Sequence, residues 1–315
     1  MHPEGPSVAV CALTFRRPAG LQRLLEGLAA LRFDGSGPRL RVVIIDNDPA
    51  GSGRATCDAF RTQFPWPLEY HIETRRGIAF ARNAALNHAR SADWIAFIDD
   101  DEKPDPNWLN ELFRVQQAEQ ADVTAGPVIP EFAADAPDWL REGGFFDRRR
   151  YLTGQRLGHA FTNNVLFRSS LLEELQLRFN ERWALMGCED RAFFQTIGMA
   201  GHRIIWANDA VVREQIPPER ANAAWLVQRH YRVGNSTSFV ERDLRGAWRA
   251  WPVQLAKSMV WLLIGLGRGL LWPFAGMTGR VRARQALAYG AGLLTGLLGR
   301  PYEEYRQSDD STPTK

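Results

Sequence analysis

The amino-acid sequence predicts an α/β fold in which a mostly parallel central sheet carries helices on both faces, followed by an apolar helical region. Strand-like and helix-like segments alternate over residues 7–120, and such repeats give parallel strands covered by helices. Polar side chains follow the end of each strand-like segment. Ligands bind beyond the carboxyl ends of strands in such sheets, so we expect a binding site at that edge.

Four strand–helix repeats form the predicted sheet. Short runs rich in apolar residues predict strands at residues 7–15, 40–48 and 94–99, and LEYHIE at residues 68–73 is a further strand candidate. Helices are predicted at residues 18–32, 53–64, 77–90 and 106–120, and the first of them has Pro18 near its start. Further strands are expected at residues 123–130 and 160–167, and further helices at residues 168–177 and 189–200.

Composition limits the class of protein. With 315 residues, 45% hydrophobic and 24% charged, the chain has the make-up of a globular protein with one catalytic domain and an appendage. A net charge of +3, without a basic stripe that interleaves aromatics, argues against nucleic acid as a partner. Three widely spaced cysteines favour a reducing compartment over disulfides or zinc. The N-terminal residues lack the pattern of a signal peptide, so we expect the catalytic part in the cytosol.

Three consecutive aspartates, Asp99, Asp100 and Asp101, follow the fourth strand. Successive side chains of a strand point to opposite faces, so we expect Asp99 and Asp101 to share one side as a D-x-D pair and Asp100 to face the other. Carboxylate oxygens suit Mg²⁺ or Mn²⁺, and Mg²⁺ commonly keeps substrate phosphates beside one or two protein carboxylates. The run therefore predicts a divalent metal that carries a diphosphate. The alternative is a solvated acidic turn.

The other strand ends carry residues suited to a nucleotide. They are Thr14, Phe15, Arg16 and Arg17 after the first strand, Asp46, Asn47 and Asp48 after the second, and Arg75, Arg76 and Gly77 after the third, with Arg82 and Asn83 one turn into the next helix. Phe15 would lie against a base, Asp46 would accept from its N–H, and the arginines would offset phosphate charge. Each residue by itself fits a turn or a surface position equally well. Together they favour a nucleotide-diphosphate pocket.

A second acidic element, Glu189 and Asp190, opens the helix predicted after Gly187. Acidic residues in a first turn are favoured by the helix dipole, so a capping role is the structural alternative. In a sugar transferase that inverts configuration, one carboxylate takes the proton of the acceptor hydroxyl. Between the two acidic elements, residues 131–159 form an irregular segment with aromatics and the run Arg148 to Arg150. This segment fits either a phosphate-linked acceptor or a solvated insert.

The order T-F-R-R-P, V-V-I-I-D-N-D, R-G-I-A-F-A-R-N, D-D-D-E and G-C-E-D-R resembles the family 2 inverting glycosyltransferases of the GT-A fold, and among them bacterial exopolysaccharide β-glycosyltransferases of the succinoglycan type. The resemblance covers about residues 7–240 and implies a nucleotide-sugar donor, most often UDP-linked, with Mg²⁺ or Mn²⁺. It implies nucleotide contacts for Thr14, Phe15, Arg17, Asp46, Gly77, Arg82, Asp99 and Asp100, with Asp99 near the ribose. Asp101 would hold the metal, Asp190 would be the base, and Glu189 would orient a substrate.

Two departures from the family pattern concern the later part of the chain. Many relatives have a metal-binding His after the strand that follows the E-D helix, where this sequence has Arg213 and Glu214. Polymerising relatives carry a Q-x-x-R-W element that binds the growing chain, whereas this sequence has QRHYR at residues 228–232. This difference indicates a transferase that adds a single sugar. Further diphosphate or acceptor contacts are predicted for Asn164, Glu214, Arg220 and Arg229.

The segment after residue 245 is rich in Trp, Leu and Gly. A continuous helix through residues 258–279 would be long enough to span a bilayer, but Arg268 near its middle argues against a lipid-facing span. Lys257 and Arg268 fall on one stripe beside Trp261 and Trp272, which favours a helix in the membrane interface. Residues 285–299 are too short to span, and the arginines at 280, 282, 284 and 300 suit anionic headgroups on the cytoplasmic side. A buried helical hairpin is the alternative.

The sequence thus predicts a catalytic domain over residues 1–245, a membrane-association region over 246–300 and a disordered tail over 301–315. The expected activity is transfer of one sugar, with inversion, from a UDP-linked donor to a lipid-linked saccharide or polysaccharide precursor. The expected location is the cytoplasmic face of the inner or plasma membrane, with a peripheral or monotopic attachment. A non-catalytic scaffold is one alternative. A sugar-nucleotide pyrophosphorylase is another, but residues 13–20 lack its Gly-rich, Lys-containing loop.

Overall fold

The computed structural model describes residues 5–35, 37–271 and 274–303. It divides into two compact units. The first comprises Met1–Pro130, Arg148–Ala184 and Glu189–Gln215, and the second comprises Glu131–Asp147, Leu185–Cys188 and Ile216–Lys315. The second unit thus begins before the predicted boundary at residue 245. Trp272 and most of the predicted tail lie outside the described residues.

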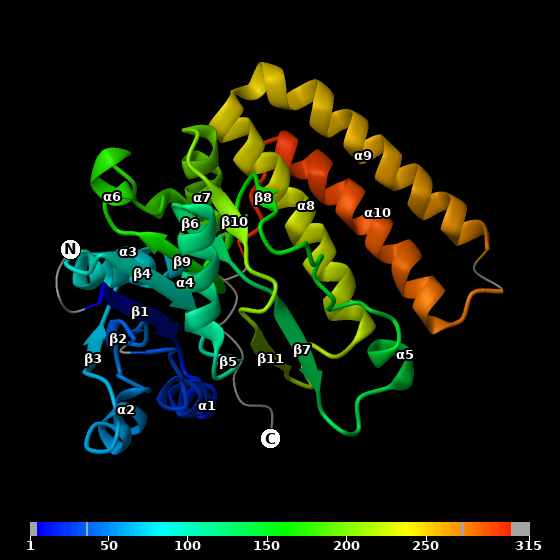
Figure 1. The fold of residues 1–315 in the computed structure, drawn as a ribbon. Coiled ribbons are helices and arrows are strands. Elements are labelled where there is room, and N and C mark those ends of the chain that lie inside the picture. The colour runs from blue at the N-terminus through cyan, green and yellow to red at the C-terminus, as the bar shows by residue number, and fades with distance from the viewer. Residues whose placement is uncertain (1–4, 36, 272–273, 304–315) are drawn as a thin grey trace. The chain divides into compact units, whose positions relative to one another are not determined.

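The first unit is built on an eight-stranded sheet with the order β3-β2-β1-β4-β9-β6-β10-β8 (Figure 1). Its strands are β1 (Ser7–Thr14), β2 (Arg39–Asp46), β3 (Leu68–Ile72), β4 (Trp94–Ile98), β6 (Val123–Ala125), β8 (Arg156–Leu157), β9 (Asn164–Arg168) and β10 (Ile204–Trp206). β1 pairs in parallel with β2 and β4, β2 with β3, and β6 with β10, whereas β9 runs antiparallel to both β4 and β6. The four predicted parallel strands are confirmed, and their carboxyl ends meet at one edge.

The prediction of one continuous strand over residues 123–130 is wrong, because the chain forms two strands there. A Cβ on Gly126 would lie 2.2 Å from the carbonyl oxygen of Ala210, and Pro127 has no N–H to donate to a ladder. β6 therefore ends at Ala125, and the chain continues as β7 (Val128–Phe132) in a second sheet of order β5-β11-β7. The other members of that sheet are β5 (Glu102–Pro104) and β11 (Val212–Ile216).

Helices cover both faces of the large sheet, as predicted. The apolar residues of α1 (Pro18–Ala29), α2 (Arg54–Phe60) and α4 (Trp108–Glu119) share one buried cluster with one side of the strands. Those of α3 (Ile78–Ala89), α6 (Leu171–Glu174) and α7 (Glu189–Met199) share the cluster on the other side. α6 is a single turn, shorter than the helix predicted at residues 168–177. The sheet is thus fixed from both sides, which holds its carboxyl edge in place.

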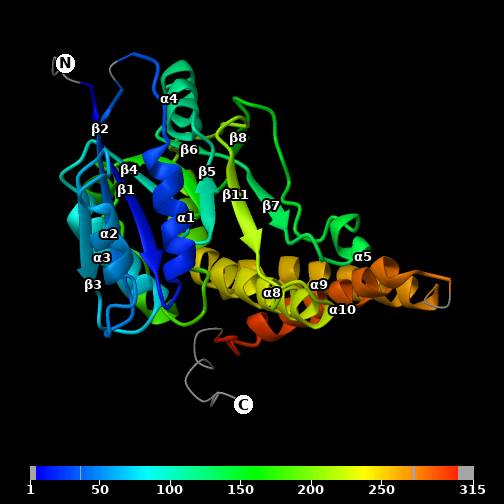
Figure 2. The ribbon, with the colours of Figure 1, turned by 90° about the horizontal axis from the view of Figure 1, so that it is seen from below.

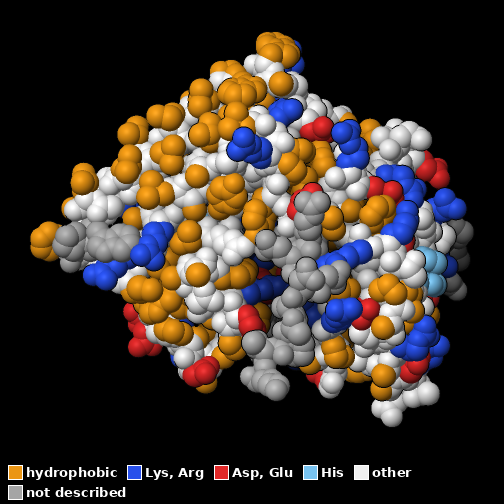
Figure 3. Space-filling view, turned by 180° about the vertical axis from the view of Figure 1, so that it is seen from behind, with side chains coloured by type: hydrophobic (Ala, Val, Ile, Leu, Met, Phe, Trp, Pro, Cys, Tyr) orange, Lys and Arg blue, Asp and Glu red, His pale blue; other side chains and the backbone are white. Residues whose placement is uncertain are grey.

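The second unit contains α5 (Asp138–Arg141) and three long helices, α8 (Ala223–Arg245), α9 (Ala247–Leu270) and α10 (Met277–Leu297). α10 lies between α8 and α9 (Figures 1 and 2). Because α9 ends at Leu270, Arg268 stands in its last turn, and the continuous helix considered for residues 258–279 does not form. Figure 3 shows hydrophobic side chains gathered over these helices at the upper left. Within the described ranges, no helix meets the length and apolarity that crossing a membrane requires.

Candidate active site

The first part of the site joins the ends of β1 and β4. The hydroxyl of Thr14 donates to Asp100 Oδ2 at 2.8 Å. One guanidinium nitrogen of Arg17 lies 3.1 Å from both Asp100 Oδ1 and Asp101 Oδ2. The predicted alternation, with Asp100 on the side opposite Asp101, is therefore wrong. Its reason is that β4 ends at Ile98, so the aspartates lie in the turn that leads to β5.

A second group of acids stands beside this turn, on β5 and β11. Glu102 faces Glu214 across the antiparallel β5–β11 pair. The backbone N–H of Gln215 donates to the carbonyl oxygen of Asp101 at 3.2 Å. Arg148 reaches Glu214 Oε2 with a guanidinium nitrogen at 2.9 Å. The turn, the end of β11 and one arginine of the irregular segment thus meet at one place.

Burial and mutual repulsion disfavour negative charge on this group. Burial raises the pKa of Asp99 to about 7, with a further rise from Asp101. Burial likewise raises the pKa of Asp100 to about 6 and that of Glu102 well above its ordinary value. Among the residues that the structure describes, no hydrogen-bond donor contacts the buried Oε1 of Glu102. Carboxylate oxygens are the ligands that Mg²⁺ and Mn²⁺ prefer, so the chemistry of these side chains fits a divalent cation.

Metal-free protein is expected to become more stable when the pH falls from about 8 to about 5. Asp99, Asp100 and Glu102 have a higher pKa in the folded than in the unfolded chain. Their contribution to stability is therefore full below their ordinary pKa values of about 4. For Asp100 and Asp99 it is lost as the pH rises through about 6 and about 7, and for Glu102 it is lost as the pH rises through its own raised pKa. Urea midpoints measured in EDTA across this range test it. Glu102→Gln, which cannot titrate, should flatten the profile. A midpoint that falls on acidification above pH 5 contradicts the prediction.

The second part of the site joins α3 to the start of α7. Arg82 and Glu189 form a buried ion pair, and the guanidinium of Arg82 also lies 3.9 Å from Asp190 Oδ2. Burial raises the pKa of Glu189 to about 7, against the lowering effect of Arg82. Asp190 is more open to solvent, and its Oδ1 accepts from the N–H of Arg191 at 2.6 Å. The capping alternative is present in the structure, because Asp190 Oδ1 binds a first-turn amide. Its Oδ2 faces Arg82, and the functional role of the pair stays a prediction.

Electrostatics connect the two parts. Arg82 lowers the pKa of Asp99, as Arg148 also does, after the larger raising effects of burial and of Asp101. Asp99 is therefore within electrostatic reach of the arginine that touches Asp190. The turn with the three aspartates and the start of α7 are thus connected through Arg82. The arrangement offers an acidic cluster for a cation and, through Arg82, a neighbouring carboxylate for a proton.

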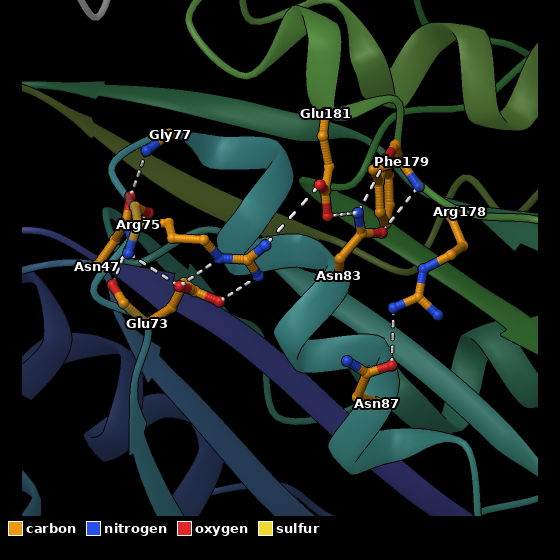
Figure 4. A network of polar contacts seen from close by, with 9 residues as sticks. All are labelled: Asn47, Glu73, Arg75, Gly77, Asn83, Asn87, Arg178, Phe179 and Glu181. Carbon is orange, nitrogen blue, oxygen red and sulfur yellow. Dashed lines mark hydrogen bonds and ion pairs between the residues drawn. The ribbon is translucent and has the colours of Figure 1, made fainter.

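A network of amide side chains fixes the loop before α3 (Figure 4). Asn47 donates to the carbonyl oxygens of Glu73 and Arg75, both at 2.8 Å, and accepts from Gly77 N at 3.0 Å. Asn83 donates to the carbonyl oxygen of Phe179 and accepts from its N–H, both at 2.9 Å. These bonds hold the Gly77 loop and the segment before α7 in fixed positions. The sequence analysis placed Asn47 and Asn83 at this edge but did not identify them as supports.

Gly77→Ala is expected to destabilise this loop by about 2–4 kcal/mol, since strain and steric contact add. Gly77 has φ +135°, and a Cβ there would lie 2.7 Å from Cβ of Ala184. Gly35→Ala is a matched control, because Gly35 also has positive φ (+78°) but no atom within 4 Å of the added Cβ. Urea unfolding of both variants gives the two costs. Equal losses at the two positions would show that the contact with Ala184 adds nothing.

Two residues that were predicted to contact ligands have buried partners within the protein. Asp46 is fully buried, and its carboxylate accepts from Asp48 N, Gly53 N and the hydroxyl of Tyr70 at 2.7–2.9 Å. It shapes the β2–α2 loop, and its predicted contact with a base stays a prediction. Asn164 is also buried; it accepts from Trp108 Nε1 at 2.8 Å and donates to two backbone carbonyl oxygens. It therefore joins β9 to its neighbours and is not available to an acceptor.

The remaining predicted residues lie as follows. Phe15 is partly buried beneath the guanidinium of Arg16, 4.9 Å from the ring centroid. Arg220 and Arg229 belong to the second unit, where both lie against Trp225, and their predicted contacts stay predictions. Arg148 and Glu102 also belong to the acidic site but were not predicted as members of it. Only the basic run at residues 148–150 and the fourth acid of D-D-D-E pointed to them.

Comparison with known proteins identifies the family. The family model for glycosyl transferase family 2 matches residues 9–176, and the model for glycosyl transferase family group 2 matches residues 94–298. The chain belongs to glycosyltransferase family 2. It is 32% identical over 300 residues to the succinoglycan biosynthesis protein ExoM of Rhizobium meliloti, covering 95% of this chain and 94% of that one. It is 22% identical over 242 residues to a glucosyl-dolichyl phosphate glucuronosyltransferase of Haloferax volcanii, covering 73% and 75%.

Solved structures of GT-A glycosyltransferases share the fold of this family 2 chain. The mannosyltransferase PcManGT from Pyrobaculum calidifontis, in complex with GDP-Man and Mn²⁺, superposes with a TM-score of 0.59 at 18% identity, over 95% of this chain and 89% of that one. S. aureus TarS 1-349 in complex with UDP-GlcNAc gives 0.53 at 15% identity, over 94% and 93%. At these identities the likeness concerns the fold. The chain is thus a family 2 glycosyltransferase with a GT-A-like α/β fold, related to a protein of exopolysaccharide biosynthesis.

Proposed function

We propose that this family 2 member is an inverting, metal-dependent transferase that moves one sugar from a UDP-linked donor to a hydroxyl of a lipid-linked or polysaccharide-precursor acceptor. The observation that carries the proposal is an electrostatic connection between Asp101 and Asp190. Both Asp101 and Arg82 shift the pKa of Asp99, and Arg82 lies 3.9 Å from Asp190. Asp101 itself pairs with Arg17. Solved structures that share this fold in complex with UDP-GlcNAc or GDP-Man support a nucleotide-sugar donor. Family membership leaves the pyrophosphorylase alternative without support.

Asp190 is the proposed general base. The acceptor O–H gives its proton to the carboxylate of Asp190 while its oxygen forms the bond to the anomeric carbon. The bond from that carbon to the diphosphate breaks on the opposite face, so the nucleoside diphosphate leaves with the electron pair and the configuration inverts. Arg82, fixed by the buried Glu189, keeps a positive charge 3.9 Å from Asp190 Oδ2. Glu189 is thus a positioning residue that acts through Arg82.

Asp101 and Glu214 are the residues proposed to hold Mg²⁺ or Mn²⁺, since the backbone bond from Gln215 to Asp101 keeps them adjacent. When bound, the cation offsets the negative charge of the departing diphosphate. Arg17 contacts both Asp100 and Asp101 and lies at the exposed side of the turn, where it can also bind a phosphate. Arg148, paired with Glu214, is a second cation at this place.

A thermal-shift panel tests donor and cofactor together. We expect UDP-sugars to raise the Tm of the purified chain only when Mn²⁺ or Mg²⁺ is present, by an amount that grows with the logarithm of ligand concentration. GDP-sugars and metal with no nucleotide serve as comparisons, and Asp101→Asn should remove the metal-dependent part. Release of UDP from the stabilising donor then separates an enzyme from a non-catalytic scaffold, because a scaffold shows no metal-dependent turnover.

A further inference from the structure

The large apolar side chains of α9 face outward. Its buried residues are small or polar: Ala250, Gln254, Ser258 and Gly265. They recur at intervals of four and seven positions, which places them on one stripe of the helix. The exposed side chains of the same helix include Trp251, Val253, Val260, Leu263, Leu266 and Leu270. A helix that packs on a water-soluble core has the opposite arrangement, with the apolar stripe inside.

Close contact with α10 fixes this orientation. Ser258 donates its hydroxyl proton to the carbonyl oxygen of Gly290 at 2.7 Å. A Cβ on Gly265 would lie 2.6 Å from Cγ of Leu287, and one on Gly290 would lie 2.8 Å from Cγ of Leu262. Turning α9 over to bury its Leu and Val side chains would force bulky groups into these glycine contacts. The apolar face therefore stays outside.

The contact between α8 and α10 also depends on glycines that let the two helices approach closely. A Cβ on Gly234, Gly292 or Gly296 would lie 2.1–2.3 Å from a backbone carbonyl oxygen of the facing helix. Association through small residues, with large apolar side chains on the outside, is the packing that helices use where the surroundings are themselves apolar. The three helices thus pack as they would beside lipid.

The exposed face is large enough to require a partner. Eleven large hydrophobic side chains of α9, from Trp248 to Leu270, have exposed fractions of 37–82%. Soluble monomers rarely expose contiguous apolar surface beyond a few hundred Å², and larger patches mark sites of interaction with proteins or membranes. Figure 3 shows hydrophobic side chains gathered on this part of the molecule.

The charge of the region selects the kind of partner. Residues 247–300 contain seven Lys and Arg and not one Asp or Glu. The whole chain carries +3, so the other residues together carry −4. A second copy of this chain would bring the same positive charge to the contact and repel it. A bilayer with anionic headgroups supplies both an apolar interior and negative charge.

Cations stand along the full length of the helix. Arg249, Lys257 and Arg268 are all exposed, near its start, middle and end. In a helix perpendicular to the bilayer some of them would sit in hydrocarbon, at high cost. In a helix parallel to the surface all three can reach headgroups, as long basic side chains do. Trp248, Trp251 and Trp261, also exposed, are of the type enriched at that depth.

We propose that the outer face of α9 docks on an anionic phospholipid bilayer, with the helix lying in the interface. The contact holds a transferase of this family at the surface where lipid-linked substrates are confined. It goes beyond the proposed function and does not depend on it, because binding to lipid requires neither donor nor acceptor.

Flotation of the purified full-length chain with vesicles tests this. Phosphatidylcholine vesicles that contain about a third phosphatidylglycerol should carry the protein, and pure phosphatidylcholine should carry at least about tenfold less, since charge contributes to binding. Leu263→Glu with Leu266→Glu should reduce binding to anionic vesicles by more than about tenfold, because two exposed apolar side chains are lost from the face. Lys257→Glu with Arg268→Glu should remove the preference for anionic lipid.

Leu152→Glu is the matched control, because Leu152 is 81% exposed in the first unit and should leave vesicle binding unchanged. Circular dichroism checks that each variant is folded. Failure of the wild-type chain to float with anionic vesicles overturns the proposal. So does a stable dimer in lipid-free buffer that the Leu263/Leu266 variant converts to monomer, because a second copy then covers the face. Metal-dependent release of UDP, measured separately, reports on the proposed chemistry and not on docking.

Discussion

Asp190→Asn is expected to reduce kcat of the transferase by about 10²–10⁴-fold, because an amide cannot take the proton of the acceptor hydroxyl. The structure gives the substitution little else to disturb. Asp190 is only partly buried, and an amide oxygen can still accept from the N–H of Arg191. The Tm, and its increase with UDP-sugar and Mn²⁺, should therefore stay close to those of the parent chain. UDP release, with a membrane lipid extract as the source of acceptor, is the measurement.

Two further variants test whether the loss of kcat is specific to the carboxylate of Asp190. Asp209→Asn makes the same change at an exposed acid of the same unit and should leave kcat unchanged. Asp190→Glu keeps a carboxylate on a longer side chain and should retain more activity than the asparagine variant. If kcat of Asp190→Asn stays within a few-fold of the parent while donor binding is intact, the proton goes elsewhere and the assignment of Asp190 is wrong.

The parallel strands and their helices could be predicted from the sequence because each depends on local patterns. Runs such as V-V-I-I before Asp46 are buried on both faces, and the Leu repeat after Pro18 forms one apolar side of α1. The break at Gly126–Pro127 was visible in the sequence as a Gly-Pro pair but was not used. α8 was not predicted. Its buried positions include Gly234, Asn235 and Ser238, so it lacks the apolar stripe on which such predictions rest.

The site residues also divide into those that local sequence patterns point to and those whose roles depend on contacts between distant parts of the chain. The D-D-D run could be noticed because three carboxylates at the end of a strand are unusual, whereas acids at a helix start are common and the E-D pair has no such signal of its own. The structural bonds of Asp46 and Asn164 could not be predicted, because their partners Tyr70 and Trp108 are remote in sequence. Composition shows that α9 is apolar, but the side that faces outward depends on glycines of α10, such as Gly290, which only the packing reveals.

The contact between Arg82 and Glu189 also joins distant parts of the sequence, and it determines the second large effect. Both side chains are almost fully buried, at 5% and 0% exposure. Breaking a buried ion pair by removing one partner costs far more than the pair itself contributes, because the remaining charge has lost its solvent and its counterion. Removing Arg82 would leave the carboxylate of Glu189 buried without a counterion. Its second oxygen, Oε2, already has no hydrogen-bond donor among the described residues.

Arg82→Ala is therefore expected to destabilise the first unit by about 3–5 kcal/mol at pH 8. The loss should shrink as the pH falls, since the pKa of Glu189 is already raised by burial and rises further without Arg82. A group with a raised pKa favours the folded state most below its unfolded value and loses that contribution as the pH rises through its folded value. Urea unfolding at pH 6 and pH 8 measures both the size and the direction of the effect.

The double variant Arg82→Ala with Glu189→Gln provides the control for charge. It leaves the same space behind Arg82 but no buried carboxylate, so it should be more stable than Arg82→Ala at pH 8 and nearly independent of pH over this range. If the double variant is as unstable as the single one, the cost comes from lost packing against Phe179, 5.7 Å from the guanidinium, and not from the unpaired charge. In either case kcat should fall, because the same guanidinium stands beside Asp190.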